Sequence, residues 1–509
     1  GIDLDLSDAE NEFLDASFAK AKRLHRLKIG VVAALAILVV VAGTSAFLAE
    51  QARSRAEIEA ETAQQTTDFV VGLFEVSDPG EARGNTITAR EIMDAGARRI
   101  EAELATQPVT QATLMETMGS VYTSLGLYDQ AVSLLQSALE KRRAVQGEDS
   151  VEAARSMHRL GDVLKLQAEY EPAFEMYQAA LEICRNRLGT EHIDTAQTIF
   201  ELADLLGRMG DFEAAEPLFR EALELQRQLF GVRSPEVAKS LEGLGLNHYD
   251  QGDYDTAEEL LREAVAMQRE LHSEPHPDLA EAINNLGFVV ADPEEGAELF
   301  IESLAMKRVL YSGEDHPEVA MGIMNVAYAM HDQAKFDEAE SLYLEAIEMQ
   351  RALLGEDHPD VAIALNNLAF LYYDKGDLDD AIALMRESLE INQRALGDEH
   401  PLVARSLHNI GAWEWAEGDF VSAEQRLRDA LTLRQTNLGA DHDDVAASLV
   451  QLAALLVDSG RFDEALPLAQ EGGRIFDAAF GPDNWQVATA KSTEGAALAG
   501  LQQFDAAEA

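Results

Sequence analysis

Small and aromatic residues recur along most of the chain at a spacing of 42 residues. An alanine marks the same position of every repeat, and one step, from Ala257 to Ala297, measures 40 residues instead. These alanines are Ala131, Ala173, Ala215, Ala257, Ala297, Ala339, Ala381, Ala423, Ala465 and Ala507. An aromatic residue stands three positions before most of them, and another small residue stands seven positions after most of them. Repetition at a fixed period of this size predicts an array of equal structural units.

One unit, residues 360–401, predicts two amphipathic helices. Apolar residues from Val361 to Tyr372 recur at helical spacing, and a second set follows from Leu378 to Leu389. Gly376 separates the two helices. Gly397 is expected to end the second helix in a left-handed cap, and Pro401 to open the next helix. A helical hairpin of this kind cannot bury its apolar face alone, so stacked neighbours must cover it.

These positions resemble the tetratricopeptide repeat, and more narrowly the 42-residue form of kinesin light chains. The matching phrase runs from Leu354 to Ala362, with His358 and Pro359 at its centre, and continues from Leu365 to Ala369. The resemblance covers about residues 110–509, as nine complete units and a truncated tenth. It implies an all-α superhelical solenoid of helix pairs. Because the tenth unit stops without a polar capping helix and the chain starts at Gly1, we expect a fragment of a longer protein.

Residues 29–49 form an uncharged, strongly apolar run of 21 residues. At a rise of about 1.5 Å per residue, such a helix spans about 30 Å, which matches the apolar thickness of a bilayer. Five lysines and arginines lie between Lys20 and Lys28, whereas only Arg53 and Arg55 follow closely. The sequence therefore predicts a single membrane helix with residues 1–28 in the cytoplasm and the repeats outside it. A cleaved signal peptide and a buried core helix are the alternatives.

Residues 50–109 are expected to form a helical linker between membrane and repeats, with one helix running from Ala89 to Leu104. The segments 69–74, 78–79, 82–84 and 88–91 resemble the region that joins the membrane helix to the repeats in bacterial receptor-type serine/threonine protein kinases. In that family the kinase domain is cytoplasmic and the repeats lie beyond the membrane, in the periplasm. Residues 6–17 are similar instead to the end of the NTPase module in some bacterial signalling ATPases.

The charge and the motifs exclude several functional classes. The formal net charge is -52, from 40 basic and 92 acidic residues, whereas binding to a phosphate backbone needs a cationic surface. The single cysteine, Cys184, can form neither an intramolecular disulfide nor a zinc site by itself. The sequence contains no phosphate-binding loop and no nucleophile elbow. We therefore expect no nucleic-acid partner, no enzymatic activity in this chain, no cofactor and no metal.

Six histidines share one register near the loop before a first helix. They are His192, His276, His316, His358, His400 and His442. A metal ladder is one interpretation, but each unit offers a single imidazole and a zinc ion needs ligands within about 2.1 Å. A helix cap or a loop hydrogen bond is the interpretation we favour.

Four asparagines are the candidate binding residues. Asn285, Asn325, Asn367 and Asn409 occupy one position of the first helix in consecutive units. A side-chain amide both donates and accepts, so it can bind the backbone of an extended peptide. The resemblance to kinesin light chains implies this role, because first helices line the inner wall of such a solenoid. The alternative is that these amides hydrogen-bond only within the fold.

Trp413 and Trp415 are spaced by two on one predicted helix, so they cannot face the same core. Either one of them lines the groove, where it could anchor a ligand, or both take part in packing between repeats. Taken together, the patterns predict a membrane-anchored scaffold that binds a protein or peptide in its concave groove. A fragment of a transmembrane kinase or signalling ATPase whose catalytic domain lies upstream of Gly1 is the alternative, and self-association is a third possibility.

Overall fold

The computed structural model describes residues 89–482 and 484–507, and the regular elements in these ranges are all α-helices. The predicted segments 1–28 and 29–49, and the part of the predicted linker 50–109 that precedes residue 89, lie outside the described residues. Among the helices that are described, none is long and apolar enough to cross a bilayer. The predicted membrane helix therefore stays a prediction.

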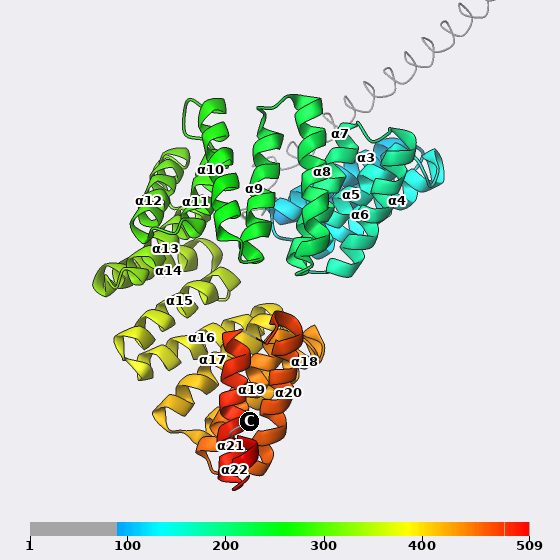
Figure 1. The fold of residues 1–509 in the computed structure, drawn as a ribbon. Coiled ribbons are helices and arrows are strands. Elements are labelled where there is room, and N and C mark those ends of the chain that lie inside the picture. The colour runs from blue at the N-terminus through cyan, green and yellow to red at the C-terminus, as the bar shows by residue number, and fades with distance from the viewer. Residues whose placement is uncertain (1–88, 483, 508–509) are drawn as a thin grey trace, which may run out of the picture. The chain divides into compact units, whose positions relative to one another are not determined.

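The chain divides into two compact units, Gly1–Leu205 and Leu206–Ala509, and the described part of each unit is built from successive helical hairpins (Figure 1). The first unit contains α2 (Ala89–Glu103), α3 (Pro108–Ser124), α4 (Tyr128–Gln146), α5 (Val151–Leu166), α6 (Tyr170–Arg187) and most of α7 (Ile193–Arg208). Helix α2 includes Ala89 and ends one residue before Leu104. Its predicted start stays a prediction, because the residues before Ala89 lie outside the described ones.

The second unit continues the same alternation of helices. It contains α8 (Phe212–Phe230), α9 (Pro235–Asp250), α10 (Tyr254–Leu271), α11 (Pro277–Val289), α12 (Pro293–Leu310), α13 (Pro317–Asp332), α14 (Phe336–Leu354), α15 (Pro359–Lys375), α16 (Leu378–Leu396), α17 (Pro401–Glu417), α18 (Phe420–Leu438), α19 (Asp443–Asp458), α20 (Phe462–Phe480), α21 (Trp485–Gly500) and the short α22 (Phe504–Ala507). In chain order, α3 to α20 alternate as the first and second helices of the nine predicted units, and α21 and α22 follow where the truncated tenth is predicted. The division into these units stays a prediction.

The histidine register is explained by helix capping. In α15, the His358 side chain is the N-cap, and its Nδ1 accepts a hydrogen bond at 3.2 Å from the backbone N–H of Asp360. The other five histidines of the register accept the same bond, two residues ahead, at 3.1–3.3 Å. This bond satisfies one of the backbone donors that every helix start leaves without an intrahelical partner. The capping interpretation is therefore confirmed.

The ends of the helices use two different glycine conformations. Gly376, which ends α15, is left-handed, with φ 87° and ψ 10°. Gly397, which ends α16, has φ 90° but ψ 162°, so the expected left-handed cap is wrong at this position. The chain leaves α16 in a positive-φ extended conformation that is nearly exclusive to glycine. This conformation leads into the His400 cap of α17.

The repeating alanine is a buried small residue near the start of the second helix in the regular hairpins. Ala173, Ala257, Ala339 and Ala381 are all fully buried. Seven residues after Ala381, the Ser388 hydroxyl lies in the core and donates to the Ala362 carbonyl at 2.7 Å. Small side chains at these two positions allow the two helix backbones of a pair to approach each other.

In the irregular fifth pair, α11–α12, the predicted register is wrong by one residue. The Ser303 hydroxyl donates to the Ala280 carbonyl at 2.7 Å, as Ser388 does to Ala362, so Ser303 and not Leu304 occupies the second small position. The first small position is therefore Gly296 and not Ala297. A Cβ on Gly296 would lie 2.9 Å from the Gly287 carbonyl oxygen, closer than real contacts of this kind. The steps around this pair are thus 39 and 43 residues, because the turn after α12 contains one additional residue.

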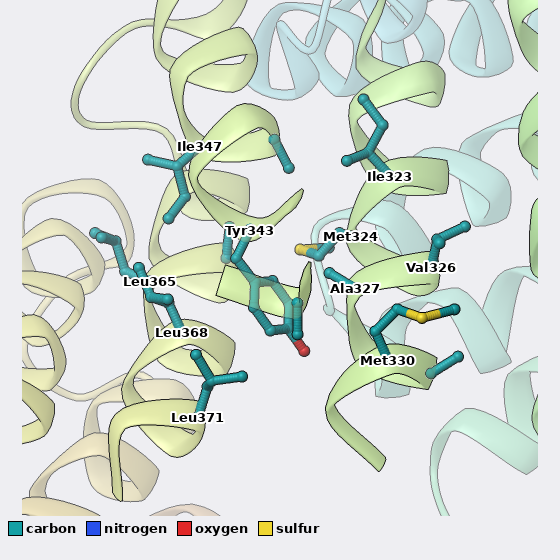
Figure 2. Close-up of a cluster of buried hydrophobic side chains, with 14 of the residues drawn as sticks. Ile323, Met324, Val326, Ala327, Met330, Tyr343, Ile347, Leu365, Leu368 and Leu371 are labelled. Atoms are coloured by element: carbon teal, nitrogen blue, oxygen red, sulfur yellow. The ribbon is translucent and has the colours of Figure 1, made fainter. Parts of the chain in front are cut away.

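Neighbouring pairs share continuous apolar cores. In the sixth and seventh pairs, Figure 2 shows Tyr343 of α14 between apolar side chains of α13, such as Ala327, and of α15, such as Leu368. All three residues are at most 1% exposed. A helix of one pair is thus covered by the first helix of the next pair, which fixes the positions of the exposed side chains described below.

Candidate peptide-binding face

The four predicted asparagines lie on four successive first helices, α11, α13, α15 and α17, at one register. All four are half-buried. Asn325 Nδ2 donates to Asn284 Oδ1 of the preceding first helix at 2.7 Å, and Asn366 Nδ2 donates to Asn367 Oδ1 at 3.3 Å. These bonds orient the amides within the face, as the alternative interpretation expects. Peptide binding by the four residues stays a prediction.

Exposed aromatic residues accompany three of these asparagines and were missed by the sequence analysis. Phe288, Tyr328 and Phe370 follow Asn285, Asn325 and Asn367 by three positions, and are 42%, 48% and 37% exposed. Residues three apart on a helix lie on the same face. The ring centroids of Phe288 and Tyr328 are 6.1 Å apart. An apolar strip therefore lies beside the asparagines on α11, α13 and α15.

The sequence signal that could have identified these aromatic residues is their common spacing of three positions after each asparagine. It was not recognised because an aromatic residue in a helical repeat usually indicates the core. The strip ends at α17, where Ala412 takes the equivalent position.

The two tryptophans of α17 take part in packing. Trp413 is 4% exposed, and its ring lies 5.2 Å from the rings of Phe370, edge-on, and Tyr373, stacked. Trp415 packs on the other side against a core that includes Leu427 and Leu456. The two side chains face different cores, as the spacing requires. The possibility that one of them anchors a ligand from an exposed position is not supported.

A cavity of about 630 Å³ opens on this face between α13 and α15. Its lining includes Asn367 together with Tyr328 and Phe370 of the aromatic strip. Asp332 and Asp374, near the C-terminal ends of α13 and α15, also line it. One predicted amide, two aromatic rings and two carboxylates therefore line the same cavity.

The equivalent register has a different chemistry in the first unit. Arg159 of α5 stands at the asparagine position, and its guanidinium pairs with Glu116 of α3 at 3.2 Å. Glu116 is 5% exposed and also binds Arg142 at 3.2 Å. With Arg159 held in this ion pair, α5 does not carry the amide and aromatic pattern of the second unit.

One histidine cluster has side chains near enough to suggest a metal site. His272, His276 and Asp278 bring potential ligand atoms within 4.8 Å of one another. The two imidazole rings are nearly parallel, with centroids 3.6 Å apart and planes 8° apart. A metal binds an imidazole nitrogen in the plane of the ring, and face-to-face rings cannot both meet this condition. In addition, His276 Nδ1 already caps α11. The cluster does not fit a metal ion.

The tetratricopeptide repeat family matches most of the chain. Its models match residues 110–186, 169–228, 194–270, 236–306, 319–391 and 360–436, and a second model of the same repeat matches 445–485. No curated protein sequence matches the chain significantly.

The solved structures that are similar to the chain share low sequence identity with it. Repeats of a protein described as a kinesin light chain in Podosopora anserina are 21% identical, over 38% of this chain and 92% of theirs, with a TM-score of 0.35. BtubC (BKLC) from P. vanneervenii is 25% identical, over 53% and 91%, with a TM-score of 0.28. The apo form of RapI is 17% identical, over 56% and 98%, with a TM-score of 0.43. Because the family models match most of the chain, and because the described helices form hairpins, the chain belongs to the tetratricopeptide repeat family.

Proposed function

We propose that the chain is a repeat scaffold that binds a protein or peptide along the first helices α11, α13, α15 and α17. The observation that carries this proposal is the pairing of half-buried amides with exposed aromatic residues on one face. Amides bind a peptide backbone without reading its side chains, and exposed aromatic residues supply apolar contact area. The tetratricopeptide repeat fold is generally non-catalytic, and its repeats generally bind protein or peptide partners.

A peptide library tests the proposal. The full chain is used to select from a random dodecapeptide library, and the affinity of the best enriched peptide is measured by fluorescence polarisation. The double substitution Asn367→Ala and Asn409→Ala removes two amides worth about 1 kcal/mol each, which corresponds to a roughly 30-fold loss of affinity. Asn186→Ala is the matched control, because Asn186 is exposed on α6. If the double variant binds as well as the parent while helicity is unchanged, the amide face is not the binding site.

Self-association makes a different prediction. If the face binds a second copy of the chain, the sedimentation coefficient should rise with concentration in the absence of any peptide. The same double substitution should then abolish the rise.

We also propose that residues 29–49 anchor the chain in a membrane, with residues 1–28 in the cytoplasm and the repeats in the periplasm. The length of the uncharged run and the excess of basic residues before it support this orientation. The scaffold would then be the recruitment or sensor part of a signalling protein, and a kinase or signalling ATPase domain upstream of Gly1 would make it a receptor. Extraction by alkaline carbonate, or protection of the repeats from protease in spheroplasts, would contradict this arrangement.

A further inference from the structure

The cavity between α13 and α15 contains a buried hydroxyl without a hydrogen-bond partner. Tyr343 of α14 is fully buried and lines the cavity, and among the described residues nothing pairs with its hydroxyl oxygen. Figure 2 shows this oxygen at the end of the ring that lies on the side of Met330. A buried hydroxyl left without a partner is unfavourable, so a ligand atom that pairs with it would stabilise the complex.

The equivalent tyrosine of the second helix pair has the hydrogen-bond partner that Tyr343 lacks. Tyr177 of α6 donates to Asp162 Oδ1 of α5 at 2.6 Å. In the sixth pair, the position of Asp162 is occupied by Tyr328, which is 48% exposed. The substitution of tyrosine for aspartate thus removes the partner of Tyr343 and at the same time adds an aromatic wall to the cavity.

The remaining lining groups favour a cation. The aromatic faces of Tyr328 and Phe370 attract positive charge through their π-systems. Asp332 and Asp374 are exposed at the rim. The one basic side chain that lines the cavity in the described part is His331, and its Nε2 lies 2.9 Å from Asp374 Oδ2. An anionic side chain would meet two carboxylates here, in a chain with a net charge of -52.

We propose that this cavity binds an arginine side chain of the peptide ligand. The guanidinium lies against Tyr328 and Phe370, within reach of the carboxylate of Asp374, and donates a hydrogen bond to the hydroxyl of Tyr343. Its planar shape and five donors suit stacking and several simultaneous bonds, which an ammonium group cannot match. Asn367 then holds the peptide main chain beside it. The inference rests on the proposed function and adds the ligand's chemistry to it.

The same library selection supplies the first test, with the full chain. We expect the enriched peptides to share an arginine at one fixed position. Replacing that arginine by citrulline, which has nearly the same shape but no charge, should weaken binding at least tenfold. Enriched peptides that lack a shared cation, yet lose affinity with Asn367→Ala and Asn409→Ala, would overturn the arginine site and leave the proposed function standing. Failure to enrich any peptide would overturn both.

Variants of the cavity supply the second test. Asp374→Asn and Phe370→Leu should each weaken the arginine peptide about fivefold and leave the citrulline peptide nearly unchanged. Asp458→Asn is the matched control, because Asp458 is exposed at the same register of α19, away from the cavity.

Tyr343→Phe separates binding from folding. It removes a hydroxyl that has no partner in the free protein, so thermal stability should not fall, whereas affinity for the arginine peptide should fall several-fold. Equal effects of Asp374→Asn and Phe370→Leu on the arginine and citrulline peptides would refute the site.

Discussion

Glu242 is a buried carboxyl group whose removal should stabilise the protein at neutral and alkaline pH. It lies on α9 with 9% of its surface exposed. Burial raises its pKa from the ordinary value of 4.5 to about 8, and the nearby carboxylate of Glu281 adds to this effect. A hydrogen bond from Gln268 of α10 favours the charged carboxylate and so lowers the pKa, but this effect is smaller than that of burial. The folded state therefore prefers the neutral carboxyl group.

The sign and size of the effect follow from this shift. The pKa of Glu242 is higher in the folded state than in the unfolded chain. The stability that the protonated Glu242 carboxyl group contributes is therefore full below pH 4.5 and is lost as the pH rises to about 8. Each pH unit in this window costs about 1.4 kcal/mol, so the total loss is about 3 kcal/mol at pH 7 and about 5 kcal/mol above pH 8. Glu242→Gln abolishes the loss. Its amide can also donate to Gln268 Oε1, a buried oxygen that lacks a partner in the described structure.

Hydrogen exchange is the appropriate assay, because repeat arrays unfold in parts and a single free energy of unfolding is poorly defined. Amides of α9 and α10 are compared between Glu242→Gln and the parent chain from pH 5 to 8, after correction for intrinsic exchange rates. We expect the ratio of protection factors to rise about tenfold per pH unit. Glu259→Gln on α10 removes the same charge from an exposed site and should give a constant ratio. A constant ratio for Glu242→Gln would refute the reasoning.

Two further predictions concern packing and acid stability. Gly296→Ala should destabilise the array by about 1–3 kcal/mol, because the new Cβ would lie 2.9 Å from the Gly287 carbonyl oxygen, whereas Gly473→Ala meets only an ordinary contact at 3.4 Å and should gain helix propensity. Thermal unfolding checks the pair, and equal melting temperatures would contradict the register of α12. Burial lowers the pKa of His408 to about 4, so its contribution to stability is full above pH 6.5 and is lost as the pH falls toward 4. In α15, Asn366 occupies the register of His408. His408→Asn should therefore recover up to about 3 kcal/mol of that loss. Urea midpoints at pH 7.5 and 4.5 measure it, and an unchanged difference between the two would exclude His408 as the cause.

The helix pairs could be predicted from the sequence because each boundary carries its own chemical signal. The histidine caps, the proline at a helix start and the fully buried Ala339 all follow from local rules. The fifth pair could not be placed correctly, because Gly296 and Ala297 are both small and only the carbonyl of Gly287 distinguishes them. A period read from residue types alone is therefore ambiguous where neighbouring residues have the same size.

The candidate site was predicted only in part, for a related reason. Asn325 and Asn367 are noticeable as polar residues within an apolar pattern, so their register could be read directly. Tyr328 and Phe370 match the apolar pattern, and their exposure depends on how neighbouring first helices pack. The lack of a partner for the Tyr343 hydroxyl is even harder to predict from the sequence, because it depends on which residue another helix places opposite this hydroxyl.

The close approach of Gly296 to Gly287 has a consequence for folding fidelity. Units that resemble one another this closely can dock one repeat out of place during synthesis, and misassembly of this kind is a characteristic failure of repeat proteins. A misplaced second helix would bring an alanine, such as Ala339, to the position of Gly296. Its methyl group would then collide with the Gly287 carbonyl on α11. The Gly287 carbonyl therefore disfavours, at this one pair, the alanine that the regular pairs carry.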